Sequence, residues 1–240
     1  MIRNHFKVIA IITWLLSSHA NSQDSNSGPD NRFYTYTDFS VVSSKIMSAK
    51  DIQAAIDSIA TEAGGSVYAI WNSVALVEDA PFNGLVKNDF IAMLSFDSGS
   101  TSTVESVDSL FRENTRIVGP VTKLYQAVDL RVSGPVSTPK GFYVHRDEHY
   151  PVDAMNTAVS LSQRAWTTWE DYWQVKVVGL FRQVDDEQSV AKLNRIVWYP
   201  SYEIWQSTRN NTDAQSRDRF RERRQLLIEG SGVAVATNRL

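Results

Sequence analysis

Gly134-Pro135-Val136-Ser137-Thr138-Pro139 separates two segments of the chain that show the same order of sequence patterns. A stretch with one glycine and two prolines in six residues cannot continue a strand or a helix. We therefore predict a linker over residues 133–140, with one folded unit over residues 32–132 and a second over residues 141–240.

The segment before the linker alternates β-rich and helical patterns. Ile52, Ile56 and Ile59 recur at helical spacing, and Gly64-Gly65 ends that pattern. The predicted elements are a strand (33–43), a helix (49–63), a strand (67–77), a turn (79–88), a strand (90–96), a short helix (104–111) and a closing strand or strands (115–130) interrupted at Gly119-Pro120.

The segment after the linker repeats this order. Asp153 can cap a helix that runs to about Tyr172, and its large apolar residues form one stripe: Met155, Val159, Trp166, Trp169 and Trp173. The predicted elements are a strand (141–150), this helix, a strand (174–183), a turn (185–187), a strand (194–199), a helical turn (201–207), a helix (213–229) ended by Gly230 and a last strand (231–238).

The order β-α-β-β-α-β, present twice, is that of the ferredoxin-like unit, whose two helices cover one face of a four-stranded antiparallel sheet. The other face needs a cover, or it becomes a large exposed apolar patch. We therefore predict an α+β protein of two tandem units whose antiparallel sheets pack face to face in an α/β-barrel-like arrangement. Eight strands can enclose side chains alone or one small ligand, so we expect the functional site in the lumen between the sheets.

Part of the second segment resembles the NIPSNAP family, within the dimeric α/β-barrel superfamily. The resemblance rests on Val178-Gly179-Leu180-Phe181 with the acidic turn after it, on Asn194-Arg195-Ile196-Val197-Trp198-Tyr199-Pro200-Ser201-Tyr202, and on Arg219-Phe220-Arg221-Glu222-Arg223-Arg224. It covers residues 141–240 well and the first segment only in outline. The resemblance implies the barrel fold but no reaction, because the wider superfamily includes cofactor-free monooxygenases, haem enzymes and binding proteins.

Composition excludes several classes of site. The chain of 240 residues has no cysteine, which excludes disulfides, thiolate metal sites and cysteine nucleophiles. Its formal net charge of -3 is a poor fit to nucleic acid. One arginine-rich stretch alternates with acidic residues, which predicts a solvated, salt-bridged helix face; its arginines are Arg217, Arg219, Arg221, Arg223 and Arg224.

Residues 1–22 have the three-part pattern of a secretory signal peptide, with Arg3 and Lys7 before an apolar run over residues 8–16. We predict cleavage after Ser22 or Ala20, a disordered leader over residues 23–31 and a secreted or periplasmic mature protein. The apolar run is too short to span a bilayer as a helix, so we expect no integral membrane span after cleavage.

Two histidines remain after cleavage, and both lie in one predicted strand. Tyr143, His145, Asp147 and His149 share a face of that strand, because side chains alternate. Histidines four positions apart are roughly 13 Å apart on a strand, too far for one metal ion with ligand bonds of about 2 Å. We therefore predict no metal site and take His145 as the candidate for proton transfer or ligand contact.

The predicted ligand-binding residues are strand residues that can face the lumen, and an aromatic lumen suits a flat, apolar ligand. They are Tyr143, His145, Arg182, Trp198 and Trp71. The opposite face of the histidine strand carries Arg146 and Glu148. If that face points inward, these two residues must pair with each other, with Arg182 or with Arg195.

Two functions of different class follow. The first is an exported protein that binds a small apolar or aromatic molecule or a protein partner, without a cofactor. The second is a cofactor-free monooxygenase or isomerase that acts on a small organic substrate in the lumen, with a haem variant that would need a histidine as axial ligand. The two units could close a barrel within a monomer, or each could pair with another chain in a homodimer.

Overall fold

A computed structural model describes residues 32–42, 47–73, 89–132, 141–184, 187, 189–229, 231 and 233–240. The predicted signal peptide, leader and linker lie outside these residues, as do the turn over residues 79–88 and Asp185-Asp186. Within the described part of the chain, no helix combines the length and the apolar character that crossing a membrane requires.

The first half has the predicted order of elements. It consists of β1 (Phe33–Val41), α1 (Ala49–Glu62), β2 (Ser66–Ser73), β3 (Asp89–Phe96), α2 (Thr101–Glu113) and β4 (Ile117–Leu130). Ser48 begins α1 with a capping box, in which its hydroxyl accepts from the Asp51 amide and the Asp51 carboxylate accepts from the Ser48 amide. Helix α1 then buries Ile52, Ile56 and Ile59, the apolar residues whose spacing predicts it.

The second half repeats the order with one additional helix. It consists of β5 (Phe142–Pro151), α3 (Met155–Trp173), β6 (Lys176–Gln183), β7 (Val190–Tyr199), α4 (Tyr202–Arg209), α5 (Ala214–Gln225) and β8 (Val233–Arg239). A short 3₁₀ helix (Val152–Ala154) joins β5 to α3. Asp153 lies inside that turn and therefore does not cap α3, contrary to the sequence-based expectation; the N-cap of α3 is Ala154.

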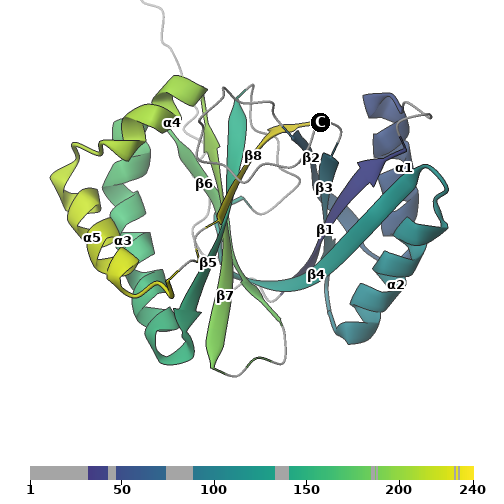
Figure 1. Cartoon of the computed structure of the whole chain (residues 1–240), viewed down its shortest axis with the longest axis horizontal. Helices are drawn as coiled ribbons and strands as arrows, with labels where there is room; N and C mark the ends of the chain where they lie inside the picture. Colours follow the sequence, from purple (N-terminus) through teal and green to yellow (C-terminus); the bar gives the residue numbers. More distant parts are fainter. Residues whose placement is uncertain are drawn as a thin grey trace, which may run out of the picture.

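The eight strands form one closed antiparallel barrel in the order β1-β3-β2-β8-β5-β7-β6-β4. Each half contributes four consecutive strands in the ferredoxin-like order, and the pairs β2–β8 and β4–β6 join the two halves at their edges. Helices α1 and α2 cover the outside of the first half, and α3, α4 and α5 lie on the outside of the second (Figure 1). The predicted α+β fold of two ferredoxin-like units is confirmed.

Large side chains fill the inside of the barrel. They include Tyr34, Tyr68, Trp71, Tyr143 and Phe181, all of which are buried and belong to one cluster. Tyr34 contacts Tyr68 and Phe181 edge to face, with ring centroids 5.2 Å apart in both pairs. An eight-stranded barrel is just wide enough for side chains to fill it, so this interior is a packed core.

The β4 strand runs unbroken through Gly119-Pro120, where the sequence predicts an interruption. Gly119 adopts a φ of +60°, and the pairing of β4 with β1 shifts register between Asp38 and Ser40. A bulge of this kind accommodates both a glycine with positive φ and a proline that lacks an N–H group. The two residues therefore bend the strand and do not end it.

Helix α5 ends at Gln225, four residues before the predicted end, and Gly230 lies outside the described residues. The amides of Leu226 and Leu227 donate to the carbonyls of Arg223 and Arg224 in a tighter final turn. Both leucines pack against the apolar core on the outer face of the second half. The helix therefore ends in a tight turn, and the two leucines that follow it are partly buried against this core.

Candidate functional site

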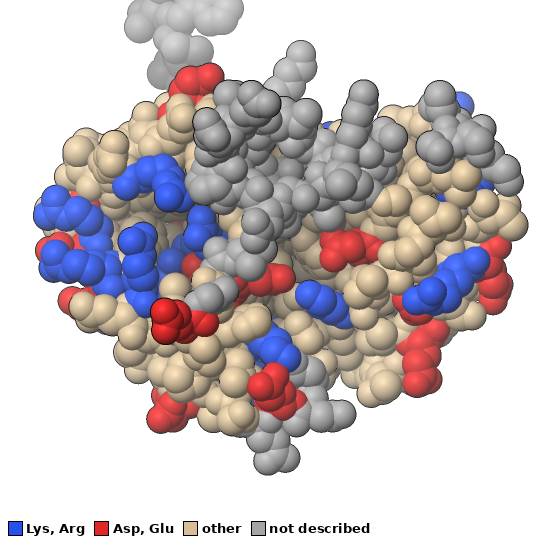
Figure 2. All heavy atoms as spheres, in the orientation of Figure 1, with Lys and Arg blue, Asp and Glu red and all other residues tan. Residues whose placement is uncertain are grey.

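A cleft of about 490 Å³ lies outside the barrel, between the outer face of β5 and β7 and the helices α3, α4 and α5. Figure 2 shows Lys and Arg side chains gathered around a hollow on this side of the molecule (left). Most of the lining residues are either apolar or cationic, and the remaining ones are Glu148, Thr208, Asn210 and Asn211. The apolar ones include Val144, Trp169, Val197, Tyr199, Trp205 and Phe220.

The cleft exists because α5 carries too few apolar side chains to close onto the sheet. In the first half, α2 buries Val107 and Phe111 completely against the core. The corresponding helix α5 offers only Phe220 among large apolar residues, and this ring packs edge to face on Trp169 of α3 with centroids 5.6 Å apart. Helix α4, which has no counterpart among the described residues of the first half, adds the buried Trp205 as a further wall.

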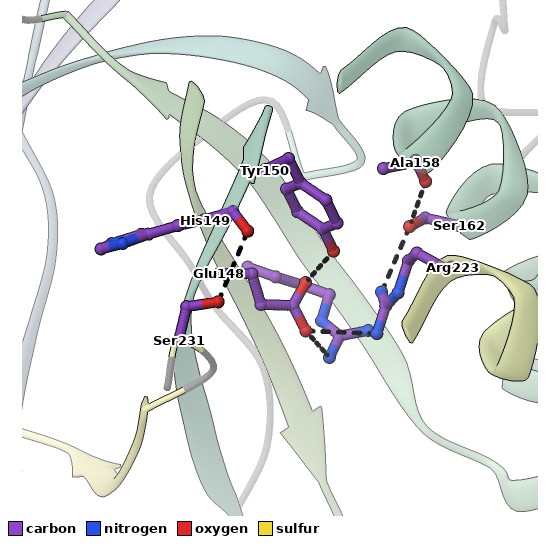
Figure 3. A network of polar contacts seen from close by, with 8 residues as sticks. Glu148, His149, Tyr150, Ala158, Ser162, Arg223 and Ser231 are labelled. Carbon is purple, nitrogen blue, oxygen red and sulfur yellow. Dashed lines mark hydrogen bonds and ion pairs between the residues drawn. The ribbon is translucent and has the colours of Figure 1, made fainter. Parts of the chain in front are cut away.

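A buried ionic network forms the floor of the cleft (Figure 3). Glu148 Oε1 accepts from Arg195 Nη2 and from Arg223 Nη2, both at 3.2 Å, and Glu148 Oε2 accepts from the Tyr150 hydroxyl at 3.0 Å. Arg223 Nη1 also donates to Ser162 Oγ at 3.2 Å. The network therefore joins strands β5 and β7 to helices α3 and α5 and fixes the position of the two guanidinium groups.

The Glu148 carboxyl is ionised in this environment. Burial by itself raises the pKa of the carboxyl, but the charges of Arg195, Arg223 and Arg146 and the hydrogen bond from Tyr150 outweigh burial and lower the pKa to about 2. Among the lining residues that the structure describes, Glu148 is the one acidic side chain, and seven are arginines. The cleft therefore carries a concentrated positive charge and attracts anions.

Four more arginines surround the mouth of the cleft: Arg209, Arg217, Arg221 and Arg224. Arg209 lies over the ring of Trp205, with its guanidinium carbon 5.3 Å from the ring centroid, a cation–π geometry. Arg217 and Arg221 both contact the Asp218 carboxylate, at 3.6 and 3.3 Å. The mouth thus combines exposed positive charge with an aromatic surface.

The structure places four of the five predicted ligand-binding residues inside the barrel and not in this cleft. Tyr143, Trp71 and Trp198 belong to the interior cluster, and His145 faces the same interior. His145 Nδ1 and Nε2 are 3.1 Å from the Tyr36 hydroxyl and from Thr237 Oγ1. Because both ring nitrogens are hydrogen-bonded and buried, the role of His145 in the structure is to link β1, β5 and β8.

Arg182, the fifth predicted residue, follows Phe181 on β6. Phe181 points into the barrel, so alternation places Arg182 on the outer face. The strand residues at the floor of the cleft are instead Arg146 and Glu148, on the opposite face of the histidine strand, and Arg195 on its neighbour β7. Alternation along β5 predicts that Arg146 and Glu148 lie on the face opposite His145 and Asp147. The sequence of the strand does not indicate which of the two faces points into the barrel.

Burial lowers the pKa of His145 from 6.5 to about 3. Because the folded pKa lies below the unfolded one, the unfolded chain binds more protons between these values, and stability falls as pH falls through this window. The slope due to this residue is up to about 1.4 kcal/mol per pH unit. We expect His145→Gln to reduce the slope of unfolding free energy between pH 6 and 4, measured by urea denaturation.

The matched control for this prediction is His149→Gln, which changes the other histidine of β5 and keeps His145. In His149→Gln we expect the unfolding free energy to keep the dependence on pH that His145 contributes. An unchanged slope in His145→Gln would contradict the assignment of a neutral, buried imidazole.

The cleft does not fit a haem with a histidine axial ligand. His145 and His149 are the histidines of the described chain, and neither lines the cleft. His149 lies on the same face of β5 as His145 by alternation, and its ring points away from the Glu148 carboxylate in Figure 3. No group of three or more potential metal-ligating side chains occurs among residues that the structure describes.

The fold and the site together define an α+β barrel of duplicated ferredoxin-like type with a basic, aromatic cleft on the outside of its second half. No model of a known protein family matches the chain, and no curated protein matches its sequence. Solved structures do match in fold.

An anthrone oxidase-like protein superposes with a TM-score of 0.56 and 8% identity, over 88% of this chain and 92% of that chain. A mutant chlorite dismutase from Candidatus Nitrospira defluvii gives a TM-score of 0.54 and 8% identity, over 89% and 93% of the two chains. The chlorite dismutase of the same organism in complex with imidazole gives 0.51 and 7%, over 89% and 92%. At such low identity these similarities establish the fold and leave the activity open.

Proposed function

We propose that the protein binds a flat or elongated apolar molecule that carries an oxyanion group, in the cleft between β5, β7 and helices α3 to α5. The observation that carries the proposal is the composition of the cleft, with apolar and aromatic walls and seven arginines against one glutamate. Its volume of about 490 Å³ is that of a small-molecule site. Aromatic walls favour the body of such a ligand, and guanidinium groups favour its carboxylate or phosphate.

The test compares two probes that differ in charge and share one aromatic body, 1-pyrenebutyrate and the neutral 1-pyrenebutanol. We expect the acid to bind at least about tenfold more tightly, because it alone can pair with desolvated guanidinium groups. Isothermal titration calorimetry on the mature protein measures both affinities. Equal affinities, or binding of neither probe, would overturn the proposal.

A second candidate function is oxidation of an aromatic substrate in the same cleft, and the similarity to an anthrone oxidase-like protein favours it. In that reaction an anthrone and dioxygen would give an anthraquinone and water. The arginines could stabilise the anionic form of the substrate. Glu148, with a pKa of about 2, is a weak base, so it is poorly suited to proton abstraction. Incubation with anthrone in air, followed by absorbance of the quinone, distinguishes the two.

We propose further that the mature protein acts outside the cytoplasm, because the pattern of residues 1–22 supports a signal peptide. The NIPSNAP resemblance stays a prediction, since the structural relatives above have other names. One chain closes the barrel by itself, and a monomer or homodimer stays the expectation for its oligomeric state.

A further inference from the structure

The arginines of the cleft fall into two groups that differ in their exposure to solvent. The side chains of Arg195 and Arg223 at the floor are 11% and 8% exposed, whereas those of Arg217 and Arg221 at the mouth are 54% and 69% exposed. The proposed function alone does not say which group meets the anionic end of the ligand.

The floor has positive charge in excess of its one carboxylate. Glu148 contacts both Arg195 and Arg223 through the same oxygen, so one negative charge faces two guanidinium groups. The Nε–H groups of both arginines also have no hydrogen-bond partner in the part of the chain that the structure describes. These Nε–H groups are buried beneath the surface of the cleft, so the capacity of the floor to hold an anion rests on its excess of positive charge.

The mouth is less suited to hold an anion. Asp218 contacts Arg217 and Arg221 and offsets part of their charge. Interactions between exposed charges contribute little and are screened by salt. Interactions at a desolvated charge are several times stronger. The exposed arginines therefore attract the ligand from a distance, and the buried ones fix it.

We infer that the ligand enters with its oxyanion first, so that this group lies against Arg195 and Arg223 while the apolar body lies between Trp169, Trp205 and Phe220. The ligand class is thus a molecule with a terminal oxyanion and an apolar body that reaches toward the mouth of the cleft. Glu148 is a positioning residue in this arrangement, because it holds both guanidinium groups without contacting the ligand. The inference rests on the proposed function.

The test measures the coupling between the probe's carboxylate and each arginine. The dissociation constants of 1-pyrenebutyrate and 1-pyrenebutanol are measured for wild type, for Arg195→Gln at the floor and for Arg221→Gln at the mouth. For each substitution, the factor by which the dissociation constant of 1-pyrenebutyrate increases is divided by the corresponding factor for 1-pyrenebutanol. A general disturbance of the cleft weakens both probes and cancels in this ratio.

We expect this ratio to be at least about 10 for Arg195→Gln and less than about 5 for Arg221→Gln. At about 0.5 M NaCl, where exposed charges are screened, the ratio for Arg221→Gln should fall to about 1. Arg195→Lys keeps the charge but not the planar fork, and we expect an intermediate ratio. A ratio for Arg221→Gln that equals or exceeds that for Arg195→Gln would overturn the oxyanion-first orientation. Loss of the wild-type preference for the acid would instead overturn the proposed function itself.

Discussion

Glu148→Gln is expected to lower the free energy of unfolding by about 3–5 kcal/mol, the cost of removing one partner from a buried ion pair. Glu148 is 2% exposed and accepts hydrogen bonds from Arg195, Arg223 and Tyr150. The neutral amide leaves two buried guanidinium groups without a counter-charge. Urea denaturation followed by circular dichroism measures the change.

Glu187→Gln is the matched control for this prediction. Glu187 also pairs with a cation, Lys192, at 2.7 Å, but its side chain is 43% exposed. Exposed ion pairs contribute about 0–1 kcal/mol, so we expect a change of at most about 1 kcal/mol. Equal stability changes in the two variants would show that the floor network does not hold β5, β7, α3 and α5 together.

The dependence of stability on pH gives the same network a second signature. The folded pKa of Glu148, about 2, lies below its unfolded value near 4.5. The stability that Glu148 contributes is therefore present above pH 4.5 and lost as pH falls toward 2. The difference in stability between wild type and Glu148→Gln should narrow over this window.

Trp71→Ala is expected to lower the free energy of unfolding by about 3–5 kcal/mol and to leave the affinity of the folded protein for 1-pyrenebutyrate unchanged within about twofold. Trp71 is fully buried inside the barrel and contacts His145 edge to face, with ring centroids 4.7 Å apart. Its removal leaves a cavity in the interior core. The cleft lies on the other face of the sheet, so its residues keep their positions.

The comparison variant is Trp205→Ala, which also removes a buried tryptophan but from the wall of the cleft. We expect this variant to lose both stability and probe affinity, the latter by at least about tenfold, because an aromatic wall is removed. Affinities are measured without urea, at a temperature at which circular dichroism shows that both variants are folded. Loss of affinity in Trp71→Ala alone would place the ligand in the barrel.

The periodicity of apolar residues predicts most of the fold. The spacing of Ile52, Ile56 and Ile59 and the stripe from Met155 to Trp173 place two helices correctly. The duplicated order then leads to eight antiparallel strands. Local sequence rules fail where tertiary contacts determine the backbone conformation. At Gly119-Pro120, pairing with β1 continues across a bulge, so the strand does not end there.

The functional site is harder to predict because both faces of β5 carry buried residues. On β5, Tyr143 and His145 point into the barrel, while Val144 and Glu148 point toward the helices, and burial is nearly complete on both sides. The sequence pattern on this strand does not distinguish the packed interior from the cleft. The cleft results instead from the scarcity of apolar residues on α5. In the sequence, the arginines of this helix alternate with acidic residues, and that pattern predicts a solvated surface.

Arg223 shows the physical reason for this failure. It follows Arg221 and Glu222 in the same charged stretch, yet its side chain is buried against Glu148 and Ser162. A charged residue can be buried only when a partner is already there, and that partner is supplied by β5, far away in the sequence. Local charge patterning therefore cannot separate Arg223 from its exposed neighbours.

A crystal structure of the mature protein with 1-pyrenebutyrate tests the location of the site most directly. We expect the pyrene ring between Trp169, Trp205 and Phe220, and the carboxylate against Arg195 and Arg223. Electron density for the probe between the two halves of the sheet, in contact with Trp71 and Tyr143, would contradict the assignment of the cleft as the binding site.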